Sequence, residues 1–138
     1  SAPTGAIVSD RGTVLPVLAL LMVGGALSVA LTVELGRCGA AWREASFAAD
    51  AGAEAGAAVL DPEAVYAGRI RLDPEAAAAA AEDAALQARP RVGRRAVAEA
   101  TTTRVCVSVT QPFPPGLLAP FVHGRPIAVA ACATPERG

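Results

Sequence analysis

The sequence is poor in the residues from which catalytic and metal sites are usually built. Aromatic residues make up only 4% of its 138 residues, and His123 is the single histidine. A zinc site needs three or four ligands, and no second histidine, cysteine or carboxylate stands at ligand spacing from His123. We therefore expect no metal site, and no motif in the sequence indicates another cofactor.

Several common functional motifs are also missing. The chain has no Walker loop, no GxGxxG after a strand and no GxSxG nucleophile elbow. Its 12 basic residues, all arginine, are balanced by 13 acidic residues, which leaves no basic footprint for nucleic acid. A membrane-tethered enzyme or ligand-binding domain would need convergent polar groups. We expect instead a protein that is not an enzyme and that binds neither nucleic acid nor a small-molecule substrate.

Apolar residues, by contrast, are abundant, and residues 13–33 (TVLPVLALLMVGGALSVALTV) carry no charge. As a helix this run would span about 31 Å, enough for the hydrocarbon core of a bilayer. Two alternatives are a cleaved signal peptide, for which the run is long, and the buried helix of a soluble domain, for which the chain is short. We predict a transmembrane-type helix at 13–33, preceded by an N-terminal tail at 1–12.

The helical pattern continues through residues 34–60, which contain no proline. We predict a helical stalk that continues the same helix, and a helix of this length needs a partner along its surface. Small residues allow such a partner to approach closely. The candidate residues for helix–helix assembly are Gly24, Gly25, Ser28, Gly36, Ala40, Gly52 and Gly56.

Charged residues follow directly after the apolar run. Glu34 stands at its end, where a charge needs a partner, and Arg37 lies three residues further on, on the same helix face. In an assembly of parallel helices we expect Glu34 to pair with Arg37 or Arg43 of a neighbouring subunit. Glu44 and Glu54 are expected on a solvated face of the helix.

Residues 61–138 are predicted to form a small α+β head. Asp61-Pro62-Glu63 and Asp73-Pro74-Glu75 each combine an N-cap, a proline at the first helical position and an acidic first turn. The second of these begins a helix at 74–89. Period-two patterns predict strands at 101–110 and 125–134, joined by a proline-rich connection at 111–124. The fold class is therefore α+β, with at least two antiparallel strands.

The register of the two strands can be tested against their cysteines. If Cys106 is opposite Cys132, then Val105, Val107 and Val109 are opposite Ala133, Ala131 and Val129, and the apolar residues share one face. Opposed cysteines on neighbouring strands can also meet disulfide geometry. We predict a Cys106–Cys132 disulfide; the alternative is two buried free thiols.

Four sequence features together resemble the TadE/TadG-like proteins, which are pilin-like or pseudopilin-like components of tight-adherence (Flp, type IVc-like) pili. The features are Asp10-Arg11-Gly12, the apolar run with Leu15-Pro16, Glu34-Leu35-Gly36-Arg37, and Ala48-Ala49-Asp50-Ala51-Gly52-Ala53. The C-terminal strand pair is also similar to their extracytoplasmic part. Type IV pilins usually carry a glutamate at the fifth position of the mature chain, where this sequence has Gly5.

The resemblance implies a structural role in a surface filament or its secretion machine, with anchorage through the N-terminal helix. Its partners would be further copies of the chain or other pilin subunits, and the membrane before assembly. We expect a single-pass protein of the cytoplasmic membrane with its C-terminal domain outside, or a subunit of an extracellular filament. The alternative is a membrane-anchored accessory or assembly factor that does not polymerise.

Overall fold

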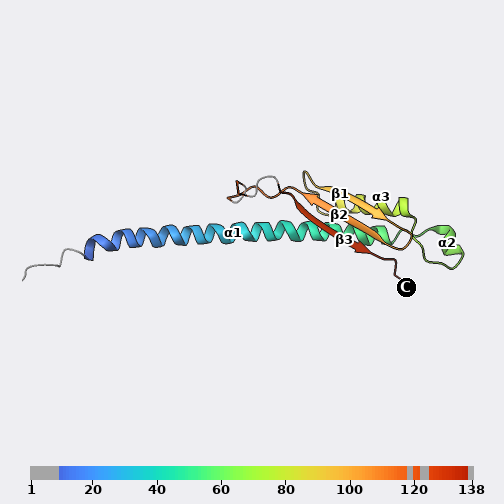
Figure 1. The fold of residues 1–138 in the computed structure, drawn as a ribbon, viewed down its shortest axis with the longest axis horizontal. Coiled ribbons are helices and arrows are strands. Elements are labelled where there is room, and N and C mark those ends of the chain that lie inside the picture. The colour runs from blue at the N-terminus through green and yellow to red at the C-terminus, as the bar shows by residue number, and fades with distance from the viewer. Residues whose placement is uncertain (1–9, 118–119, 122–124, 137–138) are drawn as a thin grey trace, which may run out of the picture. The chain divides into compact units, whose positions relative to one another are not determined.

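The computed structural model describes residues 10–117, 120–121 and 125–136, and in these residues the fold is α+β as predicted (Figure 1). Helix α1 (Asp10–Ala57) is followed by a short helix α2 (Pro62–Tyr66) and by α3 (Pro74–Gln87). Strands β1 (Arg95–Ala100), β2 (Val105–Gln111) and β3 (Ile127–Ala133) form an antiparallel sheet in the order β1-β2-β3.

The chain divides into two units, residues 1–36 and residues 37–138. We refer to the second as the C-terminal domain. It includes the second half of α1, so that most of the segment predicted as a stalk belongs to the same unit as the predicted head.

Helices α2 and α3 begin where the two Asp-Pro-Glu sequences predict. The carboxylate of Asp61 accepts a hydrogen bond from the backbone N–H of Glu63 at 3.0 Å, and that of Asp73 accepts one from Ala76 at 3.2 Å. These carboxylates satisfy N–H groups that have no partner within the helix. Helix α3 ends at Gln87 rather than at the predicted residue 89.

The pairing of β2 with β3 has the predicted register. Cys106 is opposite Cys132, and Val105, Val107 and Val109 are opposite Ala133, Ala131 and Val129. The three valines are fully buried and lie on the face of the sheet that packs on the helices. Alanines supply most of the helix side of this core: Ala41, Ala45, Ala48, Ala49 and Ala53 from α1, and Ala77, Ala81 and Ala85 from α3.

Strand β1 was not predicted, and the predicted start of β2 at residue 101 is wrong. Residues 101–104 form the turn between β1 and β2 instead of extending the strand. The hydroxyl oxygen of Thr101 accepts hydrogen bonds from the backbone N–H groups of Thr103 and Arg104, at 3.4 and 3.1 Å. A threonine side chain can stabilise a turn in this way as readily as it fits a strand.

Candidate functional site

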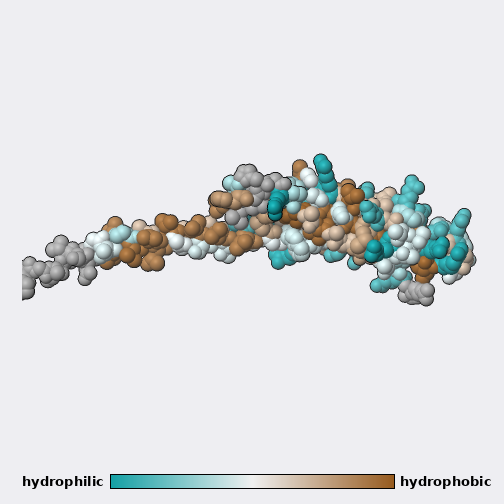
Figure 2. Space-filling model, in the orientation of Figure 1, coloured by the Kyte–Doolittle hydropathy of each residue, from teal (hydrophilic) through white to brown (hydrophobic). Residues whose placement is uncertain are grey.

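Within the described residues, α1 is the one helix that is long and apolar enough to cross a membrane. None of its most apolar 18-residue window is buried in the structure, and hydrophobic side chains cover this part of the helix in Figure 2. Val14, Leu18 and Leu21 are each at least half exposed. Such a surface is unfavourable in water and fits a hydrocarbon environment.

The small residues of the apolar segment form an open patch. Among the described residues, a Cβ placed on Gly24, Gly25 or Gly36 would meet no neighbouring atom within 4 Å beyond the adjacent helix backbone. The Ser28 hydroxyl donates to the carbonyl oxygen of Gly24 at 2.8 Å, and the Thr32 hydroxyl donates to that of Ser28 at 2.8 Å. Both hydroxyls are therefore satisfied within the helix, as an apolar surrounding requires. Ala40 is also exposed.

The predicted charge-pairing residues have different surroundings. Glu34 is only 4% exposed, although it lies on a helix whose neighbouring residues are largely exposed. Glu34 and Arg37 each already interact with another group of the chain. Arg43 is exposed. Pairing of Glu34 with an arginine of another subunit stays a prediction, since the structure holds a single chain.

Gly52 and Gly56 pack inside the C-terminal domain, at a helix–helix contact between α1 and α3. A Cβ on Gly52 would lie 2.7 Å from the Ala81 carbonyl oxygen and 2.9 Å from the Ala85 Cβ. A Cβ on Gly56 would lie 2.9 Å from both the Ala77 carbonyl oxygen and the Ala81 Cβ. The close helix contact predicted for these two glycines is thus made with α3 of the same chain.

A buried arginine connects α1, α3 and the sheet. Arg94, with a side chain only 1% exposed, donates from Nε to Oε1 of Gln111 at 3.1 Å and from Nη2 to Oε1 of Glu44 at 2.9 Å. Its Nη1 donates to the carbonyl oxygens of Ala88 and Arg89, just past the end of α3. These carbonyls have no partner within the helix, so the arginine satisfies them.

Two further contacts complete this network. Gln111 is 1% exposed, and its Nε2 donates to the carbonyl oxygen of Ala41 at 2.8 Å. Glu44 also pairs with Arg91 at 2.8 Å. The prediction of a solvated Glu44 is wrong, because its carboxylate lies between two arginines; Glu54 is exposed, as predicted. No sequence spacing links residues 44 and 94, so only the fold reveals this site.

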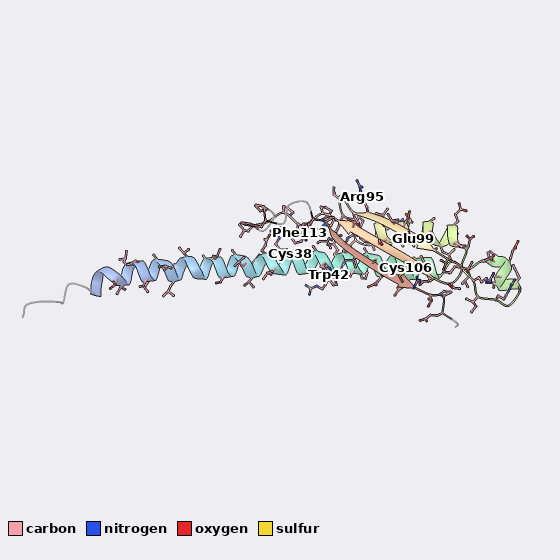
Figure 3. The ribbon with its side chains drawn as sticks, viewed as in Figure 1. Cys38, Trp42, Arg95, Glu99, Cys106 and Phe113 are labelled. Atoms are coloured by element: carbon pink, nitrogen blue, oxygen red, sulfur yellow. A yellow bond between two sulfur atoms is a disulfide. The ribbon has the colours of Figure 1, made fainter. Side chains whose placement is uncertain are left out.

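The predicted disulfide forms, and the third cysteine is a free thiol. Cys106 and Cys132 are bonded, with their Cα atoms 4.0 Å apart on neighbouring strands (Figure 3). Because Val105 and Val107 face the helices, the disulfide lies on the opposite face of the sheet. Cys38 is a partly exposed free cysteine on α1.

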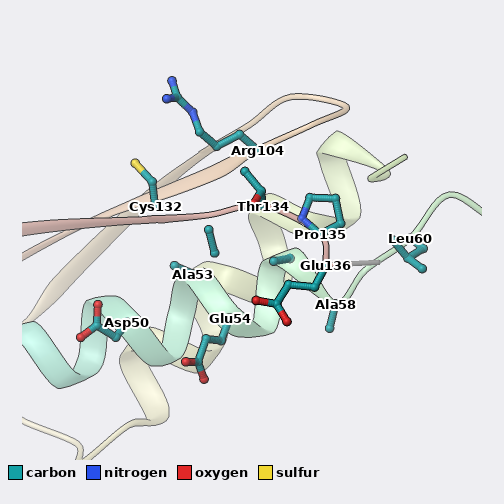
Figure 4. Close-up of a pocket in the computed structure, with 12 residues that line it drawn as sticks. Asp50, Ala53, Glu54, Ala58, Leu60, Arg104, Cys132, Thr134, Pro135 and Glu136 are labelled. Atoms are coloured by element: carbon teal, nitrogen blue, oxygen red, sulfur yellow. The ribbon is translucent and has the colours of Figure 1, made fainter. Parts of the chain in front are cut away.

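An open groove of about 770 Å³ lies between α1 and the end of β3 (Figure 4). Its wall includes the carboxylates of Asp50, Glu54 and Glu136, with Arg104 on the side of the sheet. No cluster of three or more metal-ligating side chains occurs in the part of the chain that the structure describes. His123 and Gly5 lie outside the described residues.

In the described residues the two features that stand out are therefore an exposed small-residue face on α1 and a disulfide-bonded C-terminal domain. Comparison of the chain with protein-family models, with curated proteins and with solved structures finds no match in any of the three.

Proposed function

We propose that the chain is a non-enzymatic structural subunit of a tight-adherence (Flp-type) surface pilus, either a minor or a filament-forming subunit. Before assembly it is held in the cytoplasmic membrane by residues 13–33, with the C-terminal domain outside the cytoplasm. On assembly the same helix packs against the helices of neighbouring subunits. The resemblance of the chain to TadE/TadG-like proteins supports this proposal.

The observation that carries the proposal is the open patch around Gly24, Gly25 and Ser28. No described side chain covers it, and its hydroxyl groups are satisfied within the helix. Helices in lipid gain little from hydrophobic burial against each other, so close backbone approach at small residues contributes much of their association. A patch of this kind serves a helix that leaves lipid for a contact with another helix.

A pair of substitutions separates anchorage from assembly. At 100° per residue, Ser28 and Ala26 lie about 160° apart around α1. Ser28→Leu fills the patch, whereas Ala26→Leu adds a leucine to the opposite side. Both changes increase the apolar character of the helix, so that both variants stay in the membrane.

The test is mass spectrometry of filaments sheared from cells that produce each variant, with the membrane fraction measured in parallel. We expect Ala26→Leu to enter filaments as the unchanged chain does, and Ser28→Leu to remain in the membrane. Equal incorporation of the two variants contradicts assembly through this face. Absence of the unchanged chain from filaments contradicts the subunit role itself.

One observation favours a second candidate, a membrane-anchored accessory or assembly factor that does not polymerise. Gly52 and Gly56 are occupied by α3 of the same chain. The small-residue surface that remains open for other subunits is therefore shorter than the sequence pattern predicts. For an accessory factor we expect the chain in the membrane fraction together with other pilus components, and never in sheared filaments.

A further inference from the structure

The charges of the C-terminal domain are unevenly distributed along it. Three groups of described residues make up what we call the entry end of the domain: residues 37–47, residues 87–95, and residues 110–117 with 120–121 and 125–126. The ion pairs from Glu44 to Arg91 and Arg94, at 2.8 and 2.9 Å, join the first two. The hydrogen bond from Gln111 to the Ala41 carbonyl joins the third.

The entry end is strongly basic. Its described residues include seven arginines and one carboxylate, Glu44, whereas the rest of the described domain has three arginines and ten carboxylates. Five of the seven arginines are exposed: Arg37, Arg43, Arg89, Arg95 and Arg125. Figure 3 places Arg95, Phe113 and Trp42 toward this end, and Glu99 and Cys106 further along the domain.

The same end also exposes apolar side chains. In the connection between β2 and β3, Phe121 is 85% exposed and Leu117 is 59% exposed. Phe113, in the same connection, packs instead against the hydrophobic core. Exposed aromatic and aliphatic side chains beside exposed arginines are typical of surfaces that lie in the interface of a bilayer.

The connection is long enough to reach such an interface. Ala41 is eight residues beyond Val33, the last residue of the apolar run, which is about 12 Å along a helix. Leu117 is six residues beyond Gln111, which is bonded to Ala41, and six residues of extended chain span up to about 20 Å. The length of the chain therefore allows Leu117 to reach the headgroup region of a bilayer that holds residues 13–33.

We propose that the entry end rests on the surface of the bilayer that holds residues 13–33, with its arginines at anionic headgroups and Leu117 and Phe121 in the interface. This inference rests on the proposed membrane anchorage. A bilayer with anionic lipid provides both the negative charge and the apolar layer that the entry end matches.

The test uses the full chain in phosphatidylglycerol–phosphatidylcholine vesicles with acyl chains brominated near the headgroup. Trp42 is the single tryptophan, so Trp42→Phe gives a background for one new reporter at a time. Leu21→Trp reports on the apolar helix and Phe121→Trp on the entry end. Tyr66→Trp, at a position 93% exposed and remote from the entry end, is the matched control.

We expect brominated lipid to reduce the emission of Leu21→Trp and of Phe121→Trp, and to leave that of Tyr66→Trp unchanged. Replacing phosphatidylglycerol by phosphatidylcholine, or adding Arg43→Gln with Arg125→Gln, restores the emission of Phe121→Trp but not that of Leu21→Trp. The arginines act through headgroup charge, whereas the helix stays in the hydrocarbon in either lipid.

The experiment distinguishes failure of the surface contact from failure of the membrane anchorage. Quenching of Leu21→Trp without quenching of Phe121→Trp overturns the surface contact and leaves the anchorage intact. Phe121→Trp that is shielded from dissolved iodide but not quenched by lipid shows a protein contact, and this also overturns the inference. Loss of quenching at Leu21→Trp overturns the anchorage on which both proposals depend.

Discussion

The two halves of α1 carry similar small residues but present them to different surroundings. Toward the N-terminus, Gly24, Gly25 and Gly36 have open space where a side chain would stand. Toward the C-terminus, Gly52 and Gly56 lie so close to α3 that a Cβ would meet backbone oxygen within 3 Å. The spacing of small residues therefore indicates a close helix contact without identifying the partner. In the C-terminal half that partner is α3, and in the N-terminal half no described residue lies against the glycines.

The largest loss of stability is expected from removing Arg94, which connects the C-terminal half of α1 to α3 and the sheet. Arg94→Ala leaves the Glu44 carboxylate and the buried Gln111 without their arginine partner, and leaves the carbonyls past the end of α3 unsatisfied. Loss of one member of a buried ionic network costs about 3–5 kcal/mol of stability. Urea unfolding of the full chain in detergent micelles, followed by Trp42 fluorescence, measures this loss.

Arg43→Ala is the matched control, because Arg43 is an exposed arginine on the same helix. A change of no more than about 0.5 kcal/mol is expected for it. Equal unfolding midpoints for the two variants would show that Arg94 does not hold α1 to the sheet.

A smaller effect is expected from filling the helix contact. Gly52→Ala gains up to about 1 kcal/mol of helix propensity, but its methyl group would lie 2.7 Å from the Ala81 carbonyl oxygen. Backbone cannot yield as a flexible side chain does, so overpacking prevails and a net loss of about 1–3 kcal/mol follows. Hydrogen exchange at the amides of α3 measures it, and unchanged protection there would contradict the close contact.

The sequence predicts those parts of this fold whose signals are local or strictly periodic. The Asp-Pro-Glu caps of α2 and α3 depend on a few adjacent residues, and both form as predicted. The β2–β3 register and the disulfide follow from a period-two pattern that tolerates no slip by one residue.

The features that the sequence does not predict depend either on residues far apart in the chain or on local patterns that do not distinguish a strand from a turn. Glu44 is predicted to be a solvated helix residue because no neighbouring residue in the sequence indicates its ion pair with Arg94, 50 positions later. β1 alternates alanine with larger residues, and this pattern indicates a strand only weakly. Thr101 is a residue type typical of strands, but here its side chain stabilises a turn. Gly52 is identifiable as a contact residue, but its partner in α3 is known only from the fold.

The smallest expected change in stability is a gain, and it tests the difference between the two halves of α1 directly. Gly39 lies on α1 between the two halves, and a Cβ there would meet no described neighbour within 4 Å. Gly39→Ala should therefore keep the gain in helix propensity that Gly52→Ala loses, about 0.5–1 kcal/mol. In a domain of this size such a gain raises the Tm by several degrees. Thermal unfolding of the full chain in micelles should move the midpoints of the two variants in opposite directions. If Gly39→Ala is also destabilising, the surface of α1 around Gly39 is already in contact with another part of the protein. The division of α1 into an exposed N-terminal half and a C-terminal half packed against α3 would then be wrong.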